Sequence, residues 1–194
     1  MDFFILGQSI LNNYFSAKFF ILKAILTAEQ LALSIKRLAR QVVENHLQLE
    51  NTVLIGIQPR GVFMSNRLVE EFKSLVPVEN IKCGKLDITF YRDDVRTELK
   101  LANATDIPFN IENKNVVIID DVLWTGRTIR AALDALLAFG RPAKVELCVL
   151  IDRRFTRQLP IQPDYVGRTI DTFAGQKVIV HWQETFGKDE VLLG

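Results

Sequence analysis

The chain has 194 residues, of which 48% are hydrophobic and 24% charged, a balance that fits one globular domain and excludes a disordered or collagen-like chain. With 24 basic and 23 acidic residues the net charge is +1, so any surface that binds nucleic acid must be a local patch. The two cysteines, Cys83 and Cys148, lie far apart in the sequence without a CxxC pair, and the chain has two histidines, so the sequence gives no cysteine–histidine metal motif. The low cysteine content favours a reducing compartment, and we expect a cytoplasmic protein.

The first segment of the chain differs from the rest. Residues 1–24 contain short apolar stretches broken by polar side chains, whereas a secretory signal needs a basic start and a continuous apolar core. No segment approaches the length of a membrane-spanning helix. We therefore predict an N-terminal extension of unknown role over residues 1–24 and a single domain over residues 25–194.

The first predicted helix covers residues 27–46. Thr27 and Gln30 have the spacing of a capping box, and apolar residues then recur on one helical face. Beyond this helix we predict a strand at 53–57, a helix at 62–75, a strand at 81–91, a polar flap over 92–112, a strand at 116–119, a helix at 129–139 and strands at 145–151 and 178–182. Alternating strands and helices indicate an α/β fold with a mostly parallel central sheet flanked by helices.

The strand at 116–119 is followed by the strongest chemical signal in the chain. Asp120 and Asp121 come directly after it, and Thr125-Gly126-Arg127-Thr128 opens the next helix. Free backbone N–H groups at a helix N-terminus favour a phosphate, and a glycine allows its close approach. Carboxylates beside a phosphate site need hydroxyl partners, such as those of a sugar. The string predicts a site for a ribose 5-phosphate, although capping roles for these residues are the alternative interpretation.

Residues 116–128 resemble the phosphoribosyl-diphosphate motif of type I phosphoribosyltransferases. Arg127, where many relatives have glycine, and several other segments are similar to the bifunctional pyrimidine operon regulator/uracil phosphoribosyltransferase family. These segments include Ile55–Gly61, Leu86–Asp94, Thr105–Phe109, Asp152-Arg153 and Asp164–Gly167. The resemblance implies the type I phosphoribosyltransferase fold, with a flexible flap and a small hood.

The resemblance also implies roles for individual residues. Asp120 and Asp121 would hold the ribose hydroxyls, and Arg92 on the flap would close over the site. The expected catalytic residues are Asp120, Asp121 and Arg92; the expected substrate-binding residues are Pro59, Arg60, Gly61, Val122, Leu123, Trp124, Thr125, Gly126, Arg127, Thr128, Arg153 and Val178. The family's diphosphate loop usually reads Lys-Thr-Arg-Gly, whereas this chain has Gln58-Pro59-Arg60-Gly61, which removes a positive charge and an N–H donor.

The implied reaction transfers a phosphoribosyl group from phosphoribosyl diphosphate to uracil and yields UMP and diphosphate. Mg²⁺ would be held mainly through substrate oxygens, with no direct protein ligand. The family's second activity is attenuation of pyrimidine operons by binding messenger RNA, for which the candidate residues are Lys36, Arg37 and Arg40. Relatives form dimers or larger homo-oligomers. Two alternatives stay open: a non-catalytic nucleotide-sensing RNA-binding attenuator, and a phosphoribosyltransferase for another base.

Overall fold

The computed structural model describes residues 22–93, 102–173 and 175–194. Its strands are β1 (Lys23–Leu26), β2 (Thr52–Ile57), β3 (Cys83–Leu86), β4 (Asn115–Leu123), β5 (Lys144–Arg154), β6 (Tyr165–Asp171), β7 (Val178–His181) and β8 (Glu190–Leu193). Its α-helices are α2 (Ala28–His46), α3 (Arg60–Phe72), α4 (Arg127–Leu136) and the short α5 (Gln183–Phe186). Single 3₁₀ turns cover Leu47–Leu49, Val78–Asn80 and Thr89–Tyr91.

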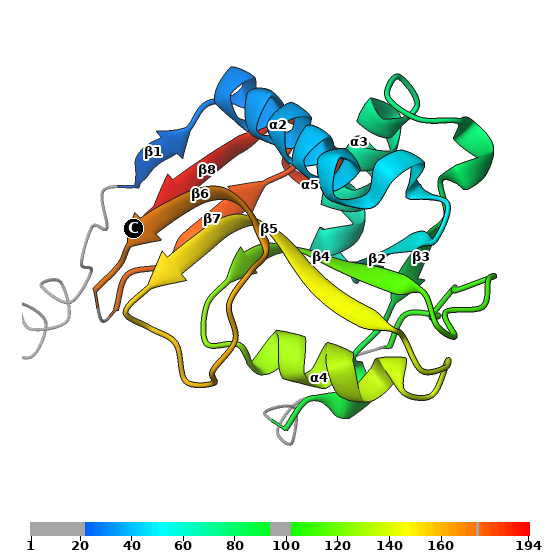
Figure 1. The fold of residues 1–194 in the computed structure, drawn as a ribbon. Helices are drawn as coiled ribbons and strands as arrows, with labels where there is room; N and C mark the ends of the chain where they lie inside the picture. The colour runs from blue at the N-terminus through cyan, green and yellow to red at the C-terminus, as the bar shows by residue number, and fades with distance from the viewer. Residues whose placement is uncertain (1–21, 94–101, 174) are drawn as a thin grey trace, which may run out of the picture.

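The central sheet has five parallel strands in the order β3-β2-β4-β5-β6. Helices α2 and α3 cover one face of this sheet and α4 covers the other (Figure 1). Strands β2 and β4 are buried along most of their length, as expected for a parallel sheet covered on both faces. The predicted α/β fold with a mostly parallel sheet is confirmed.

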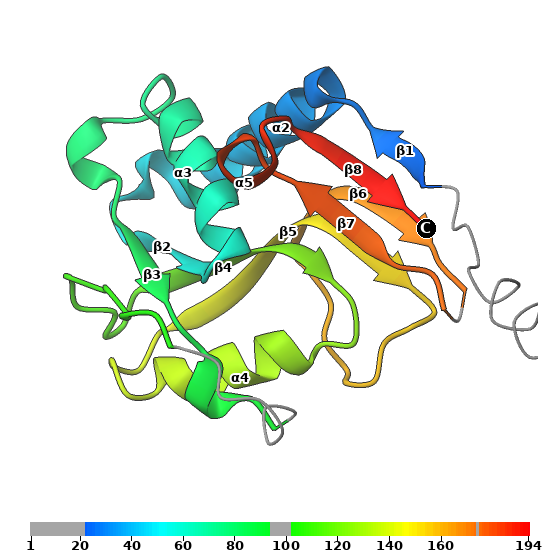
Figure 2. The same ribbon diagram turned by 180° about the vertical axis from the view of Figure 1, so that it is seen from behind.

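A second, smaller sheet forms the hood that the resemblance implies. Strands β1, β8 and β7 pair antiparallel in this order, so the two ends of the described chain meet in one sheet. Figure 2 shows β7 beside the carboxyl ends of β4 and β5, and β7 contacts β4. Residues on β7 therefore face the same edge of the central sheet as the residues that follow β4.

The predicted first helix is confirmed in detail. Thr27 caps α2, and both hydrogen bonds of the capping box with Gln30 are present. Its apolar stripe is buried against α3 and the sheet, through Leu31, Ile35, Leu38 and Val42. Among the described residues, no helix combines the length and the apolar composition needed to cross a lipid bilayer.

Several predicted boundaries are wrong. The strand expected at 81–91 ends at Leu86, because the chain then forms a 3₁₀ turn at Thr89–Tyr91. Strands β4 and β5 extend further than their apolar runs, so Asp120 and Asp121 belong to β4 itself. Strand β6 is not among the strands expected from the sequence, because this edge strand is half-buried or exposed along most of its length and lacks a continuous apolar run.

Candidate active site

The carboxyl end of the central sheet opens into a cavity of about 830 Å³. Its wall is formed by the β4–α4 connection, the start of α3, the flap residue Arg92 and strand β7. The complete lining is Ile57, Gln58, Pro59, Arg60, Ile88, Thr89, Arg92, Asp120, Asp121, Val122, Leu123, Trp124, Thr125, Gly126, Arg127, Thr128, Ile129, Arg153, Gln158, Lys177, Val178 and Ile179. This cavity lies where open α/β sheets bind ligands.

The cavity brings together all of the residues predicted to bind or transform substrate, with the exception of Gly61. Gly61 has a packing role instead. A Cβ atom at this position would lie 2.2 Å from the carbonyl oxygen of Ile119. Only a glycine therefore allows the first turn of α3 to approach the end of β4 this closely.

Two adjacent carboxylates end the buried part of β4. Asp120 and Asp121 are 8% and 4% exposed, and Asp120 Oδ1 accepts a 2.9 Å hydrogen bond from the Asp121 backbone N–H. Burial, followed by the charge of Asp121, raises the pKa of Asp120 well above its ordinary value. Burial also raises the pKa of Asp121 to about 6, although nearby Arg60 acts in the opposite direction. These carboxylates are poorly solvated and have raised pKa values, as is common for groups at functional sites.

The loop before α3 faces this acidic pair. The Gln58–Pro59 peptide bond is cis, and the Gln58 side chain donates a 2.7 Å hydrogen bond to the carbonyl oxygen of Ala104. Arg60 is the first residue of α3 and its Nη1 lies 4.0 Å from Asp121 Oδ2. Because the Arg60 side chain is 56% exposed, it keeps a cationic group available at the cavity.

The start of α4 has the geometry of an anion-binding helix terminus. Gly126 is the N-cap residue, with φ of +92° in the left-handed region, a conformation that favours glycine. Thr125 Oγ1 accepts a 3.3 Å hydrogen bond from the Arg127 backbone N–H. Thr128 Oγ1 accepts a 3.1 Å hydrogen bond from Arg92 Nη1, so the flap residue and the predicted phosphate loop are in direct contact.

Arg127 points toward the flap. Its Nη1 lies 2.9 Å from Asp93 Oδ2, and Arg130 contacts the same carboxylate at 3.2 Å. Its Nε donates a 2.8 Å hydrogen bond to Gln158 Oε1. Arg127 therefore connects α4 to the described start of the flap; of the predicted flap, residues 94–101 lie outside the described residues.

One carboxylate binds residues on both sides of positions 94–101. Asp87 Oδ1 accepts a 2.8 Å hydrogen bond from the Thr89 N–H, and Oδ2 accepts a 3.0 Å bond from the Asn103 N–H. Burial acts to raise the pKa of Asp87, but the hydrogen bonds from Thr89 and Asn103 outweigh it and lower the pKa. Asp87, which was not predicted as a site residue, thus links Thr89, just before the predicted flap, to Asn103 within it.

A buried arginine borders the cavity on the hood side. Arg153 is 4% exposed, and burial lowers its pKa. Its side chain donates to Thr172 Oγ1 and to the Gln176 carbonyl oxygen, and its guanidinium lies 4.8 Å from the Trp124 ring centroid. Trp124 is 52% exposed, so its ring borders both the arginine and the open cavity. Val178 lies at the start of β7 on the same side.

Two residues that were not predicted for the site are Gln158 and Lys177. Both line the cavity, but they come from irregular segments without a motif. The Gln158 backbone N–H bonds to the Thr125 carbonyl oxygen at 3.0 Å, and Lys177 pairs with Gly194 through backbone hydrogen bonds. Only the fold brings these residues to the end of β4.

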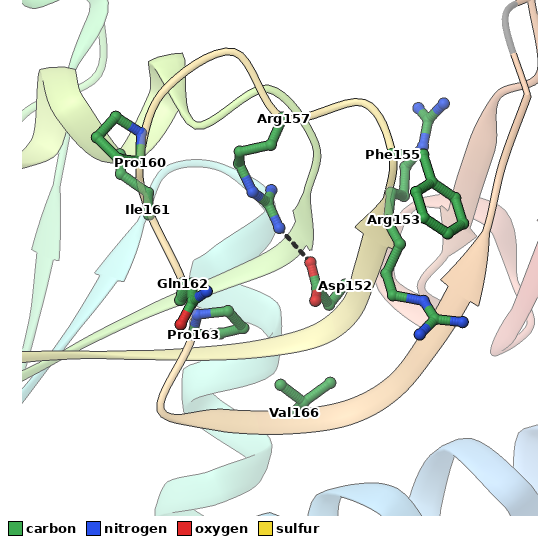
Figure 3. A pocket seen from close by; sticks show the side chains of 10 residues that line it. Asp152, Arg153, Phe155, Arg157, Pro160, Ile161, Gln162, Pro163 and Val166 are labelled. Carbon is green, nitrogen blue, oxygen red and sulfur yellow. Dashed lines mark hydrogen bonds and ion pairs between the residues drawn. The ribbon is translucent and has the colours of Figure 1, made fainter.

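A second cavity, of about 600 Å³, lies beyond the carboxyl end of β5 (Figure 3). Its arginines are already engaged within the protein: Arg157 pairs with Asp152, as Figure 3 shows, and Arg154 pairs with Asp171 at 2.6 Å. Phe155 is 80% exposed and has a φ of +64°.

The three residues predicted to contact RNA are all exposed on α2. Arg37 Nη2 donates to the backbone carbonyl oxygens of Val166 and Gly167 on β6, so this guanidinium connects α2 to the sheet. Arg40 donates to the Lys36 carbonyl oxygen at 3.4 Å. Lys36 and Arg40 remain the more accessible cations of this candidate surface.

The cavity offers a metal ion few carboxylate oxygens. Within residues 22–93, 102–173 and 175–194, no group of three or more His, Cys, Asp or Glu side chains could hold a metal ion. Only the adjacent pair Asp120 and Asp121 supplies carboxylate oxygens to the cavity. Mg²⁺ in phosphate-binding sites takes most of its ligands from substrate and water, so few protein ligands are needed.

Comparisons with known proteins agree with this geometry. A family model described as "Phosphoribosyl transferase domain" matches residues 22–185. The chain is 41% identical over 172 residues to the "Bifunctional protein pyrR" of Enterococcus faecalis, covering 88% of this chain and 96% of the relative. It is 45% identical over 170 residues to the "Bifunctional protein PyrR" of Picosynechococcus sp., covering 87% and 95%.

Solved structures share the fold at lower sequence identity. A hypoxanthine phosphoribosyltransferase from Trypanosoma cruzi superposes with a TM-score of 0.67 at 21% identity, covering 88% of this chain and 90% of that chain. A hypoxanthine phosphoribosyltransferase from Staphylococcus aureus gives a TM-score of 0.65 at 22% identity, covering 87% and 90%. At this identity the likeness concerns the fold.

Proposed function

Since the chain belongs to the phosphoribosyltransferase family and, within it, to the bifunctional PyrR proteins, we propose that it is a uracil phosphoribosyltransferase. It makes UMP and diphosphate from uracil and phosphoribosyl diphosphate. The observation behind this proposal is that one cavity, at the carboxyl end of β4, holds all the groups that the substrate needs. It is lined by the acidic pair, the start of α4, Arg60 and Val178 on the hood.

Each part of the substrate has a matching group in the cavity. The N-terminus of α4, with Thr125 and Thr128, binds the 5-phosphate through N–H and hydroxyl groups. Asp120 and Asp121 accept hydrogen bonds from the ribose hydroxyls, which removes the cost of burying unpaired carboxylates. The start of α3, at Pro59 and Arg60, receives the diphosphate.

Uracil binds on the hood side of the cavity. The backbone of β7 near Val178 offers N–H and C=O groups that can pair with the alternating donors and acceptors on the edge of the base. Arg153 is fixed by Thr172 and Gln176 and borders the same side. Trp124, half-exposed beside Arg153, completes this wall.

The reaction is a displacement at the anomeric carbon. A bond forms from a uracil ring nitrogen, the bond to the diphosphate oxygen breaks, and the ring nitrogen loses its proton. Catalysis consists of positioning the two reactants and stabilising the charge of the separating groups. Arg60 and Arg92 place positive charge near the departing diphosphate. Mg²⁺ carried by the substrate supplies further neutralisation of the diphosphate when bound.

A second activity, binding of pyrimidine operon messenger RNA, is supported by the bifunctional relatives and by the exposed cations of α2. Lys36 and Arg40 give this surface positive charge without help from the net charge of the chain, which is only +1. The patch is small, so binding is weak and depends on salt.

We place the protein in the cytoplasm as a homo-oligomer. Both of its cysteines are free thiols, which suits a reducing compartment. Exposed apolar side chains on and after α4, Leu133, Leu137 and Phe139, are compatible with subunit contacts. Light scattering in solution measures the assembly directly.

The test is a turnover assay with Mg²⁺, phosphoribosyl diphosphate and a panel of labelled bases. We expect UMP from uracil and little or no product from hypoxanthine, guanine or orotate. Product from another base would reassign the substrate. No product from any base, with UMP still bound, would leave the nucleotide-sensing attenuator as the function.

A further inference from the structure

Two polar atoms stand out in the buried part of the protein. Among the described residues, Asp121 Oδ2 and Trp182 Nε1 are the buried side-chain nitrogen and oxygen atoms without a hydrogen-bond partner. Buried polar groups are almost always paired, so each of these atoms needs an explanation. The Trp182 side chain also acts to lower the pKa of Asp121, which places the indole N–H, the only polar group of that side chain, beside the Asp121 carboxylate.

Trp182 is held in place from several directions. It follows β7 directly, is 1% exposed, and lies 6.5 Å from the Phe63 ring. The Arg67 guanidinium lies 4.5 Å from its ring centroid. Arg67 is in turn bound by Glu184 at 3.0 Å and by Asp189 at 2.8 Å. The indole therefore has little freedom to turn its N–H toward any other acceptor.

This arrangement connects the hood to the catalytic strand. Trp182 belongs to the segment after β7, whereas Asp121 lies on β4. We propose that Trp182 is a positioning residue for Asp121: its indole N–H is the donor for Asp121 Oδ2 and fixes this carboxylate toward the ribose hydroxyls. This inference rests on the proposed function in its last step, because it takes Asp121 to bind the ribose.

The contact itself can be tested without turnover. The chain has two tryptophans, so a Trp124→Phe background leaves Trp182 as the sole indole fluorophore. In this background we expect the emission to change as the pH falls through about 6, where Asp121 takes up a proton, and Asp121→Asn to abolish the change. Emission that does not change, or a change that persists in Asp121→Asn, would overturn the proposal.

Other charged groups near the pair require a control. Asp121 lies next to Asp120 and near Arg60. Trp182 lies against Arg67, which is bound by Glu184 and Asp189, and it follows His181, which pairs with Glu190 at 2.8 Å. His181→Gln is expected to keep the fluorescence transition. Loss of the transition in this variant, with Asp121→Asn leaving it intact, would assign the signal to the histidine and contradict the proposal.

The kinetic test separates hydrogen bonding from packing. Trp182→Phe keeps an aromatic ring but removes the N–H, so we expect kcat/KM for phosphoribosyl diphosphate to fall about tenfold and the acidic limb of its pH profile to move to higher pH. Phe63→Leu loosens the packing around the same indole but keeps the donor, and is expected to leave the acidic limb in place. Equal pH profiles for both variants and the parent protein would contradict the positioning role.

The two tests keep this proposal separate from the proposed function. If the protein transfers no phosphoribosyl group to any base, the fluorescence transition still reports the contact between Trp182 and Asp121. If turnover occurs but the transition is absent, only the role of Trp182 is wrong.

Discussion

At the scale of single residues, the most testable feature is the free-energy cost of burying the carboxylates of Asp120 and Asp121. The pKa of Asp121 is about 6 in the folded protein, against an ordinary value of 3.8, so the folded state binds this proton more tightly than the unfolded chain. The stabilisation from this group is complete below pH 3.8 and is lost as the pH rises through about 6. Asp121→Asn is therefore expected to raise the free energy of unfolding at pH 7 by on the order of 2 kcal/mol, measured by urea denaturation.

The same substitution is expected to reduce activity. Loss of charge-assisted hydrogen bonds to the ribose lowers kcat/KM roughly 10- to 100-fold, and in the parent protein kcat/KM falls as the pH drops through about 6. The matched control is Asp134→Asn, an exposed carboxylate on α4 that pairs with Arg130 at 3.6 Å, for which we expect stability changes within about 0.5 kcal/mol. A less stable, fully active Asp121→Asn variant would refute the assignment.

Gly126 has both a conformational and a packing requirement. With a φ of +92° and Ile161 Cδ1 only 3.2 Å from the position of an added Cβ, Gly126→Ala is expected to cost about 1–2 kcal/mol and to weaken UMP binding. Gly187→Ala has a similar backbone requirement at φ +71° with no atom within 4 Å, so it should lose stability but retain UMP affinity in calorimetric titrations. Equal loss of affinity in both variants would argue against a phosphate site at Gly126.

At the scale of elements, the site depends on the close approach of α3 to β4. Because a Cβ at position 61 would lie 2.2 Å from the Ile119 carbonyl oxygen, Gly61→Ala must shift α3 or the end of β4. We expect a loss of about 1–3 kcal/mol in stability and a weaker affinity for diphosphate, because Arg60 moves relative to Asp121. Asn66→Ala, at an exposed position of the same helix, is expected to change neither. A neutral Gly61→Ala would contradict this account of the interface.

At the scale of the whole molecule, the proposed second activity needs a surface for RNA, and its candidate is α2. Removing two exposed cations by Lys36→Ala and Arg40→Ala is expected to weaken binding to a pyrimidine leader RNA and to reduce the salt slope by roughly 1.4, at about 0.7 per phosphate contact on a single strand. Arg37→Ala is a poorer probe, since it also removes hydrogen bonds to β6. The control removes two exposed lysines, Lys82 beside β3 and Lys85 on it. An equal loss of RNA affinity in Lys82→Ala and Lys85→Ala would argue against a defined RNA surface on α2.

The central strands and the phosphate loop could be predicted because their signals are local. The capping box of Thr27 and the strand–acid–glycine string around Asp121 each lie within a few residues. The hood could not be predicted from periodicity, because β1 and β8 are four-residue strands whose pairing joins distant parts of the chain. The hydrogen bonds of Asp87 depend on tertiary packing, which leaves no local pattern.

The measurement that tests the central claim most directly is a crystal structure with UMP bound. The account predicts the phosphate within hydrogen-bond distance of the backbone N–H groups of residues 126–128, and the ribose hydroxyls on Asp120 and Asp121. UMP in the cavity beyond β5, or a ribose turned away from both carboxylates, would contradict it.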